Sequence, residues 1–184
     1  MDSRSTQGGG GRCRAGYTLL ELMVVLVLMG IAAALVIPNV QGSESIRIQT
    51  AVRAIASDIM YTQSDALAYQ ARRAVVFDPA GNSYEIWEVI GGELDQVMYK
   101  IDGPNQEFAV SVGTTSGGAA QLVSADFDED TVLVFDELGG PVAGLDSDAP
   151  SAGGSIVLNG QDGTSYRLSV EPYTGRVTVQ RIGG

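Results

Sequence analysis

The 184-residue chain is acidic, with 11 Lys and Arg residues against 22 Asp and Glu residues and a formal net charge of −11. Because like charges repel, this balance disfavours binding to nucleic-acid phosphates and to anionic lipid head groups. The sequence has no histidine and one lysine, Lys100, so it lacks the commonest general base and zinc ligand, and we expect no enzymatic activity. Cys13 is the only cysteine, which excludes an intramolecular disulfide.

The N-terminal part of the chain combines a basic leader with a long apolar segment. Residues 1–16 are polar and rich in glycine, and they carry three arginines against one aspartate. The 21 residues from Tyr17 to Ile37 carry a single charge. A helix of 21 residues is about 31 Å long, which matches a hydrocarbon core of about 30 Å. Residues 17–38 are therefore predicted to span a membrane once, with the basic leader on the cytoplasmic side and the rest of the chain outside.

A cleaved secretory signal peptide is the competing interpretation of this segment. Signal peptides usually have a shorter apolar region, of about 7 to 15 residues. Here residues 39–72 continue a helical period beyond the apolar run. The simplest prediction is one long helix with a membrane half, 17–38, and an amphipathic half, 39–72. The positions predicted to face the core of the protein are Ile48, Val52, Ile55, Ile59, Thr62, Ala66 and Tyr69.

Two residues weaken the predicted membrane helix. Pro38 lacks the N–H that would bond to a carbonyl one turn earlier, which predicts a kink or a locally opened turn. Gly30 lowers helix stability by about 1 kcal/mol relative to alanine. Membrane helices tolerate both residue types, so a flexible joint at Gly30 and Pro38 is one of two interpretations.

After Arg73 the sequence changes to an alternating pattern rich in β-branched residues, which predicts strands. Turn signals such as DPAGNS, LNGQDGTS and EPYTGR lie between them, and the last two predict tight antiparallel hairpins. Two glycine-rich acidic stretches, 113–130 and 137–154, are predicted to be loops. The expected fold class is α+β, a long N-terminal helix packed against an antiparallel β domain at 73–184. The predicted strands are 74–78, 83–90, 96–100, 107–112, 131–136, 155–159, 165–170 and 176–180.

Glu21 is the single charge in the apolar segment. An ionised carboxylate in hydrocarbon costs several kcal/mol unless a partner neutralises it. Thr18 and Glu21 have the spacing of a capping box, and a carboxylate in the first helical turn gains about 0.3 to 1 kcal/mol from the helix dipole. These local effects explain a glutamate at this position, but they leave the basic, glycine-terminated leader before it unexplained.

The leader ending in Gly16, followed by Tyr17, the residues TLLE and an apolar helix, resembles the type III signal of type IV pilins and type II secretion pseudopilins. The resemblance implies that a prepilin peptidase cleaves between Gly16 and Tyr17 and methylates the new amino group of Tyr17. It also implies that Glu21 pairs with the N-terminal amine of a neighbouring subunit during assembly. Gly30 and Pro38 fall where family members have a helix segment that unwinds in the filament.

The rest of the chain is similar to minor pseudopilins and minor pilins of the GspH/FimT type. The similarity rests on three segments: the helix end DIMYTQSDALAYQARR leading into AVVFD, the segment VLVFDELGGPV, and the closing hairpin SYRLSVEPYTGRVTV. It implies the pilin fold and a subunit of the inner membrane that joins other pseudopilins on an inner-membrane assembly platform. The resemblance further implies that the resulting periplasmic filament drives protein export. The alternatives are a minor pilin that takes part in assembly or priming of a type IV pilus, and a membrane-anchored periplasmic binding module.

Other candidate sites have weaker signals, and no cofactor is expected. Six acidic residues offer oxygen atoms to Ca²⁺, which major pseudopilins bind in an acidic loop, but their spacing matches no EF-hand loop. Trp87 lies in an alternating segment where a core position is favoured. DNA binding needs a basic surface, and the C-terminal region has only three arginines, so no nucleic-acid partner is expected. The acidic residues are Asp126, Asp128, Glu129, Asp130, Asp146 and Asp148, and the arginines are Arg167, Arg176 and Arg181.

Overall fold

The computed structural model of the chain describes residues 17–36, 43–100, 103 and 105–183. The chain divides into two compact units, residues 1–41 and residues 42–184. The predicted leader, residues 1–16, and the predicted kink at Pro38 lie outside the described residues. The kink therefore remains a prediction.

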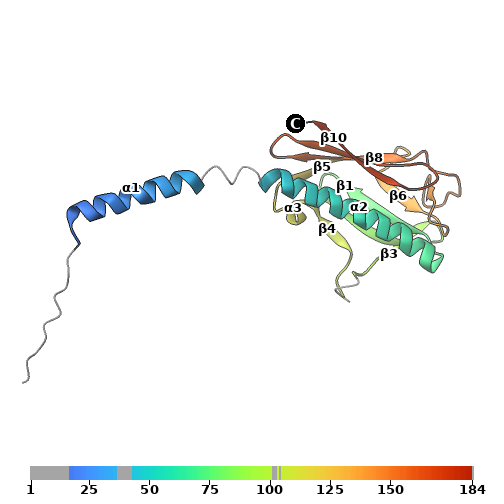
Figure 1. Cartoon of the computed structure of the whole chain (residues 1–184). Coiled ribbons are helices and arrows are strands. Elements are labelled where there is room, and N and C mark those ends of the chain that lie inside the picture. The colour runs from blue at the N-terminus through green and yellow to red at the C-terminus, as the bar shows by residue number, and fades with distance from the viewer. Residues whose placement is uncertain (1–16, 37–42, 101–102, 104, 184) are drawn as a thin grey trace, which may run out of the picture. The chain divides into compact units, whose positions relative to one another are not determined.

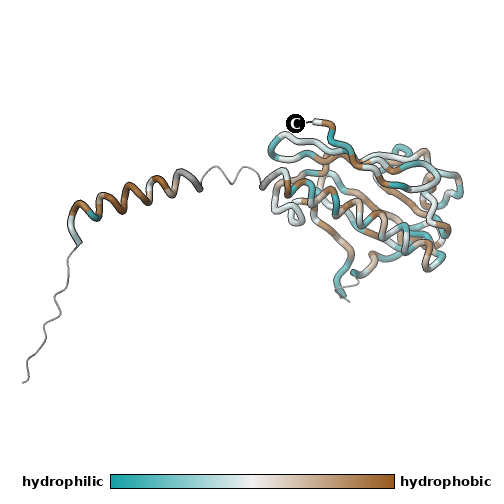
Figure 2. The backbone as a smooth tube through the Cα atoms, in the orientation of Figure 1, coloured by the Kyte–Doolittle hydropathy of each residue, from teal (hydrophilic) through white to brown (hydrophobic). Residues whose placement is uncertain are grey.

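The first unit contains helix α1, Leu19–Val36. Its residues are hydrophobic along almost the whole length, as the brown tube in Figure 2 shows. Among the described residues, no helix combines the length and the hydropathy that crossing a membrane requires.

The second unit contains helix α2, Ser43–Tyr69, and the strands (Figure 1). The helix buries one face, as its sequence period predicts: Ile48, Val52, Ile55 and Ile59 are each 3% exposed or less. The prediction is wrong for Tyr69, which is exposed because the helix ends there.

The end of α2 is set by a residue in the left-handed conformation. Gln70 has a φ of 49°, and the N–H of Ala71 donates to the carbonyl oxygen of Ala66 at 3.1 Å. Such a bond back across the last turn satisfies a helix carbonyl that would otherwise lack a partner. The chain then turns directly into the first strand.

Two antiparallel sheets form the rest of the second unit. The first sheet has six strands, in the order β3-β2-β1-β6-β7, with β4 paired to β2. The second sheet has four strands, in the order β10-β9-β8-β5. The bounds in the first sheet are β1 Arg73–Asp78, β2 Ser83–Ile90, β3 Glu93–Val97, β4 Ala109–Ser111, β6 Val132–Phe135 and β7 Pro141–Val142. Those in the second are β5 Ala120–Phe127, β8 Gly154–Gly160, β9 Ser165–Val170 and β10 Val177–Gly183.

The main core lies where α2 packs against both sheets. The buried face of α2 joins residues of the first sheet, such as Val75 and Phe135, with residues of the second, such as Leu158 and Leu168. Because the two sheets share this helix, burial of its apolar face holds them together in one domain. The expected α+β architecture is confirmed.

A smaller apolar cluster lies apart from the main core. It consists of Ala74, Val89, Val134 and Val142. Trp87 was expected in the core, and it is half-buried against this cluster, with Nε1 donating to Glu85 Oε2 at 3.0 Å.

The largest error of the sequence-based assignment is the stretch 113–130, which was expected to be a loop. It contains most of the short helix α3, Val112–Thr115, and the whole of β5. Strand β5 carries a β-bulge between Leu122 and Ser124, which interrupts the alternation of buried and exposed residues. Period-two patterning therefore fails to identify it.

The other strand boundaries differ by small amounts. The expected strand 96–100 is found earlier, as β3, and the expected strand 107–112 is reduced to the three residues of β4. The expected loop at 137–154 is interrupted only by β7 and the start of β8. The two predicted hairpin turns that follow β8 and β9 are present.

Candidate assembly site

Thr18 organises the start of α1. The N–H of Glu21 donates to Thr18 Oγ1 at 3.2 Å, and the N–H of Leu22 donates to the Thr18 carbonyl oxygen at 3.2 Å. Thr18 is therefore the N-cap residue, and Glu21 occupies the third helical position. The hydroxyl half of the predicted capping box is present.

Glu21 lies among uncovered apolar side chains. Tyr17 is 79% exposed, and Leu20 and Leu22 are 73% and 55% exposed. Among the described residues, no ion pair involves the Glu21 carboxylate. An apolar surface of this kind marks a site that lipid or another protein covers. The carboxylate thus stands at the edge of a contact surface with its charge uncompensated by the described part of the chain.

The remaining predicted site residues are only partly described. Gly30 lies within the continuous helix α1, where a Cβ atom would meet nothing within 4 Å. Gly16 and Pro38 lie outside the described residues. Cleavage after Gly16, methylation of Tyr17, pairing of Glu21, and unwinding near Gly30 and Pro38 therefore remain predictions.

Sequence reasoning gave no role to Arg73, the first residue of β1. Its side chain is buried, and Nε lies 2.7 Å from Oδ2 of Asp65, whose side chain is also buried. Nη1 donates to the Arg72 carbonyl oxygen at 3.1 Å, and Nη2 lies 3.4 Å from Glu88 Oε1. Arg73 thus joins the end of α2 to the first two strands through charged contacts. The only signal in the sequence was the pair of arginines at the helix-to-strand junction.

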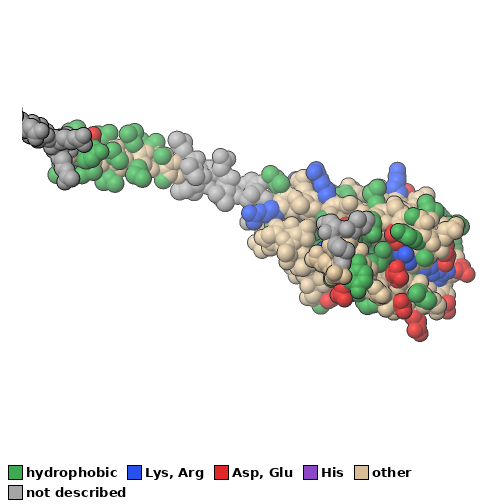
Figure 3. All heavy atoms as spheres, turned by 90° about the horizontal axis from the view of Figure 1, so that it is seen from below, with side chains coloured by type: hydrophobic (Ala, Val, Ile, Leu, Met, Phe, Trp, Pro, Cys, Tyr) green, Lys and Arg blue, Asp and Glu red, His purple; other side chains and the backbone are tan. Residues whose placement is uncertain are grey.

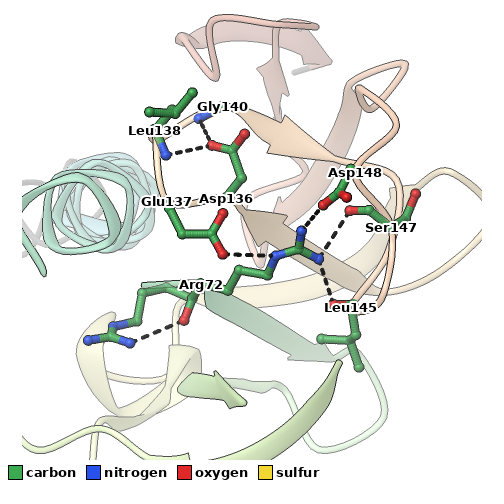
Figure 4. A network of polar contacts seen from close by, with 9 residues as sticks. Arg72, Asp136, Glu137, Leu138, Gly140, Leu145, Ser147 and Asp148 are labelled. Atoms are coloured by element: carbon green, nitrogen blue, oxygen red, sulfur yellow. Dashed lines mark hydrogen bonds and ion pairs between the residues drawn. The ribbon is translucent and has the colours of Figure 1, made fainter. Parts of the chain in front are cut away.

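Arg72 holds the long loop that follows β6 (Figure 4). Its Nη1 donates to the carbonyl oxygens of Leu145 and Ser147 at 3.0 and 3.2 Å. Nη2 pairs with Asp148, and Nε lies 3.5 Å from Glu137 Oε1. The Arg72 guanidinium group therefore contacts both ends of the segment from Glu137 to Asp148. Composition alone had predicted only that this segment is a loop.

Two of the acidic residues considered for calcium, Asp128 and Asp148, have other contacts. Asp128 accepts hydrogen bonds from Ser151 Oγ and from the N–H of Ala152, and Asp148 pairs with Arg72. In the parts of the chain that the structure describes, no group of three or more His, Cys, Asp or Glu residues is placed to hold a metal ion. Acidic side chains are visible at several separate points on the face of the domain in Figure 3.

An apolar helix behind a processing-type motif, followed by an amphipathic helix packed on antiparallel sheets, defines a pilin-like protein. The prokaryotic N-terminal methylation motif matches residues 11–37, and the family described as type II transport protein GspH matches residues 51–175. The second match covers more than half of the chain, so the chain belongs to the GspH family.

Individual relatives carry names from the same secretion system. The chain is 38% identical over 79 residues to type II secretion system core protein G of Pseudomonas aeruginosa, a match that covers 39% of this chain and 56% of that protein. It is 26% identical over 163 residues to type II secretion system protein H of Xanthomonas campestris pv. campestris, covering 88% of this chain and 80% of the relative. Thus the chain spans little more than half the length of the first relative and most of the second.

A solved structure of the minor pseudopilin EpsH of Vibrio cholerae is also similar. The superposition has a TM-score of 0.49 at 8% sequence identity and covers 71% of this chain and 92% of that one.

Proposed function

We propose that the protein is a minor pseudopilin of a type II secretion system. In this proposal the prepilin peptidase removes residues 1–16 and methylates Tyr17 while the chain is held in the inner membrane. The subunit then leaves the membrane on the assembly platform and joins other pseudopilins in a periplasmic filament. The subunit acts by polymerising with other pseudopilins, and the growing filament pushes exported proteins outward. The proposal assigns no catalytic residue.

The observation that carries the proposal is that Glu21 has no charged partner among the described residues. Its carboxylate lies near the start of an uncovered apolar helix and forms no ion pair with the described residues. An unpaired charge in the bilayer costs up to about 2.5 to 3.5 kcal/mol on insertion scales, the upper value applying at the bilayer centre and a smaller one near the start of the span, where Glu21 lies. A positively charged group supplied from outside the described chain would remove that penalty.

Cleavage after Gly16 supplies such a group. It converts the backbone nitrogen of Tyr17 into an amine, which is cationic at neutral pH because α-amino groups have pKa values of about 7.7 to 8.0. The amine of one subunit is then available to the Glu21 carboxylate of the next. Since the pair forms only between correctly placed subunits, it favours one axial register of the filament. Processing must therefore come before assembly.

The single-pass topology in this proposal follows from the sequence. The basic leader faces the cytoplasm, and the acidic domain of residues 43–183 lies in the periplasm. A membrane-anchored binding module would share this topology. Such a module would not require a carboxylate without a charged partner, such as Glu21, at the start of its membrane anchor.

A minor pilin of a type IV pilus is the second candidate, because the same cleavage motif and helix serve both filaments. Deletion of the gene in its native host separates them. We expect the deletion to reduce extracellular protein secretion strongly while leaving surface pili in electron micrographs unchanged, with both measured against a strain complemented by the intact gene. Loss of pili with normal secretion would assign the protein to the pilus instead.

A further inference from the structure

A groove in the second unit is lined by residues of α2, of α3 and of the segment around β4. Figure 1 shows where these elements lie in the domain. We call this groove the α2–β4 groove and define it by Asp58, Tyr61, Tyr84, Lys100 and Phe108. Its volume is about 460 Å³. This volume falls within the range of about 300 to 1,000 Å³ that is usual for ligand sites.

The groove holds a carboxylate in a fixed position. Asp58 Oδ2 accepts a hydrogen bond from the hydroxyl of Tyr84 at 2.5 Å, and Tyr84 is 1% exposed. Burial raises the pKa of Asp58, although the Tyr84 hydrogen bond and the charge of Lys100 act in the opposite direction. Within the described part of the chain, Asp58 forms no ion pair. The groove therefore contains a partly desolvated acid that a cation would stabilise.

Aromatic rings form another part of the groove. Tyr61 and Phe108 are stacked, with ring centroids 5.6 Å apart and an interplanar angle of 19°. The ammonium nitrogen of Lys100 lies 5.6 Å from the Phe108 centroid, within the range of a cation–π interaction. The only lysine of this acidic chain thus already rests against the groove. The position of Lys100 indicates that the groove stabilises a positively charged group.

We propose that the α2–β4 groove binds the guanidinium group of an arginine side chain carried by a partner protein. A guanidinium group is planar, so it can stack on an aromatic ring and also donate two hydrogen bonds to a carboxylate. Asp58 supplies the carboxylate, and Tyr61 and Phe108 supply the rings. The buried hydroxyl of Tyr84 positions Asp58 and does not contact the arginine itself.

In this proposal, Lys100 competes with the incoming arginine for the groove. Its ammonium group occupies one face of Phe108 without forming an ion pair with Asp58. An incoming arginine would therefore share the groove with Lys100 or displace it, and removal of the lysine charge should strengthen binding. The inference concerns the folded domain alone, so it does not depend on filament assembly, and its failure would leave the proposed function unaffected.

The test is a titration of the full, ¹⁵N-labelled chain in detergent micelles with N-acetyl-arginine methylamide, followed by nuclear magnetic resonance. We expect saturable shifts of the amides of Ser57, Asp58, Tyr61 and Phe108. The variant Asp58→Asn, which keeps an acceptor for Tyr84, should weaken binding about tenfold because the charge-assisted hydrogen bonds are lost. The variant Lys100→Met should tighten binding about threefold.

The matched control for Lys100→Met is Arg53→Met, which removes an exposed positive charge from α2 outside the groove. It should change the affinity little, whereas an equal gain in both variants would show that only net charge matters and would overturn the proposal. Equal binding of N-acetyl-norleucine methylamide would show an apolar site instead. Tighter binding of the lysine analogue, or unchanged binding by Asp58→Asn, would also contradict an arginine site.

Discussion

Replacement of Glu21 with alanine is expected to leave cleavage of the leader intact and to lower incorporation into filaments about a hundredfold. The reason is that the N-terminal amine of the neighbouring subunit would lose its partner in an apolar environment, where an unpaired charge costs up to about 2.5 to 3.5 kcal/mol. The measurement is an immunoblot of sheared, purified filaments compared with the subunit retained in the membrane. The mass of the membrane-retained subunit reports whether cleavage took place.

Thr18→Val is the matched control for this prediction. It removes the hydroxyl that accepts from the Glu21 N–H and so weakens the helix cap by about 1 kcal/mol, but it keeps the carboxylate. If the role of Glu21 is pairing between subunits, Thr18→Val assembles almost normally. Equal loss of assembly in both variants would mean that Glu21 serves only to cap α1.

Replacement of Arg73 with methionine is expected to destabilise the second unit by about 3 to 5 kcal/mol. The substitution keeps an unbranched apolar stem in place of the arginine, but it leaves the buried carboxylate of Asp65 without its partner at 2.7 Å. Uncompensated buried charges account for some of the largest effects of single substitutions. The measurement is urea unfolding of the full chain in detergent, followed by the fluorescence of Trp87, the only tryptophan.

Arg176→Met is the control for Arg73→Met. Arg176 also pairs with a carboxylate, Glu171, at 2.6 Å, but its side chain is 69% exposed, so its loss should have little effect on stability. The double variant Asp65→Leu with Arg73→Met should recover much of the lost stability, because it removes both buried charges together. A cost for Arg73→Met no larger than that for Arg176→Met would contradict the role assigned to Arg73.

The sequence predicted the elements whose patterns are regular. The buried face of α2 follows from apolar residues at three- and four-residue steps, and β2 and β9 have the bounds that their alternation predicted. Strand β5 was missed because its bulge breaks the alternation and its neighbours are glycine-rich. Strand β5 pairs with β8, which begins more than twenty residues after β5 ends. The residue pattern of a short stretch carries no information about such a distant partner strand.

The start of α1 was predictable because its capping contact is local, whereas the assembly role of Glu21 stays a prediction. Gly16, Tyr17, Thr18 and Glu21 are neighbours in the chain, and the N-cap contact of Thr18 spans three residues. The contacts of Arg72 and Arg73 and the α2–β4 groove were not predictable in the same way. They join residues that are distant in the sequence, such as Asp58 and Tyr84 or Arg72 and Leu145, and only the folded chain brings these together.

The intact mass of subunits recovered from assembled filaments tests the central claim most directly, which is that proteolysis creates the amine that neutralises Glu21. We predict the mass of a chain that begins at Tyr17 and carries one added methyl group. A mass corresponding to a chain that begins at Met1, found in filaments that still support secretion, would contradict the claim.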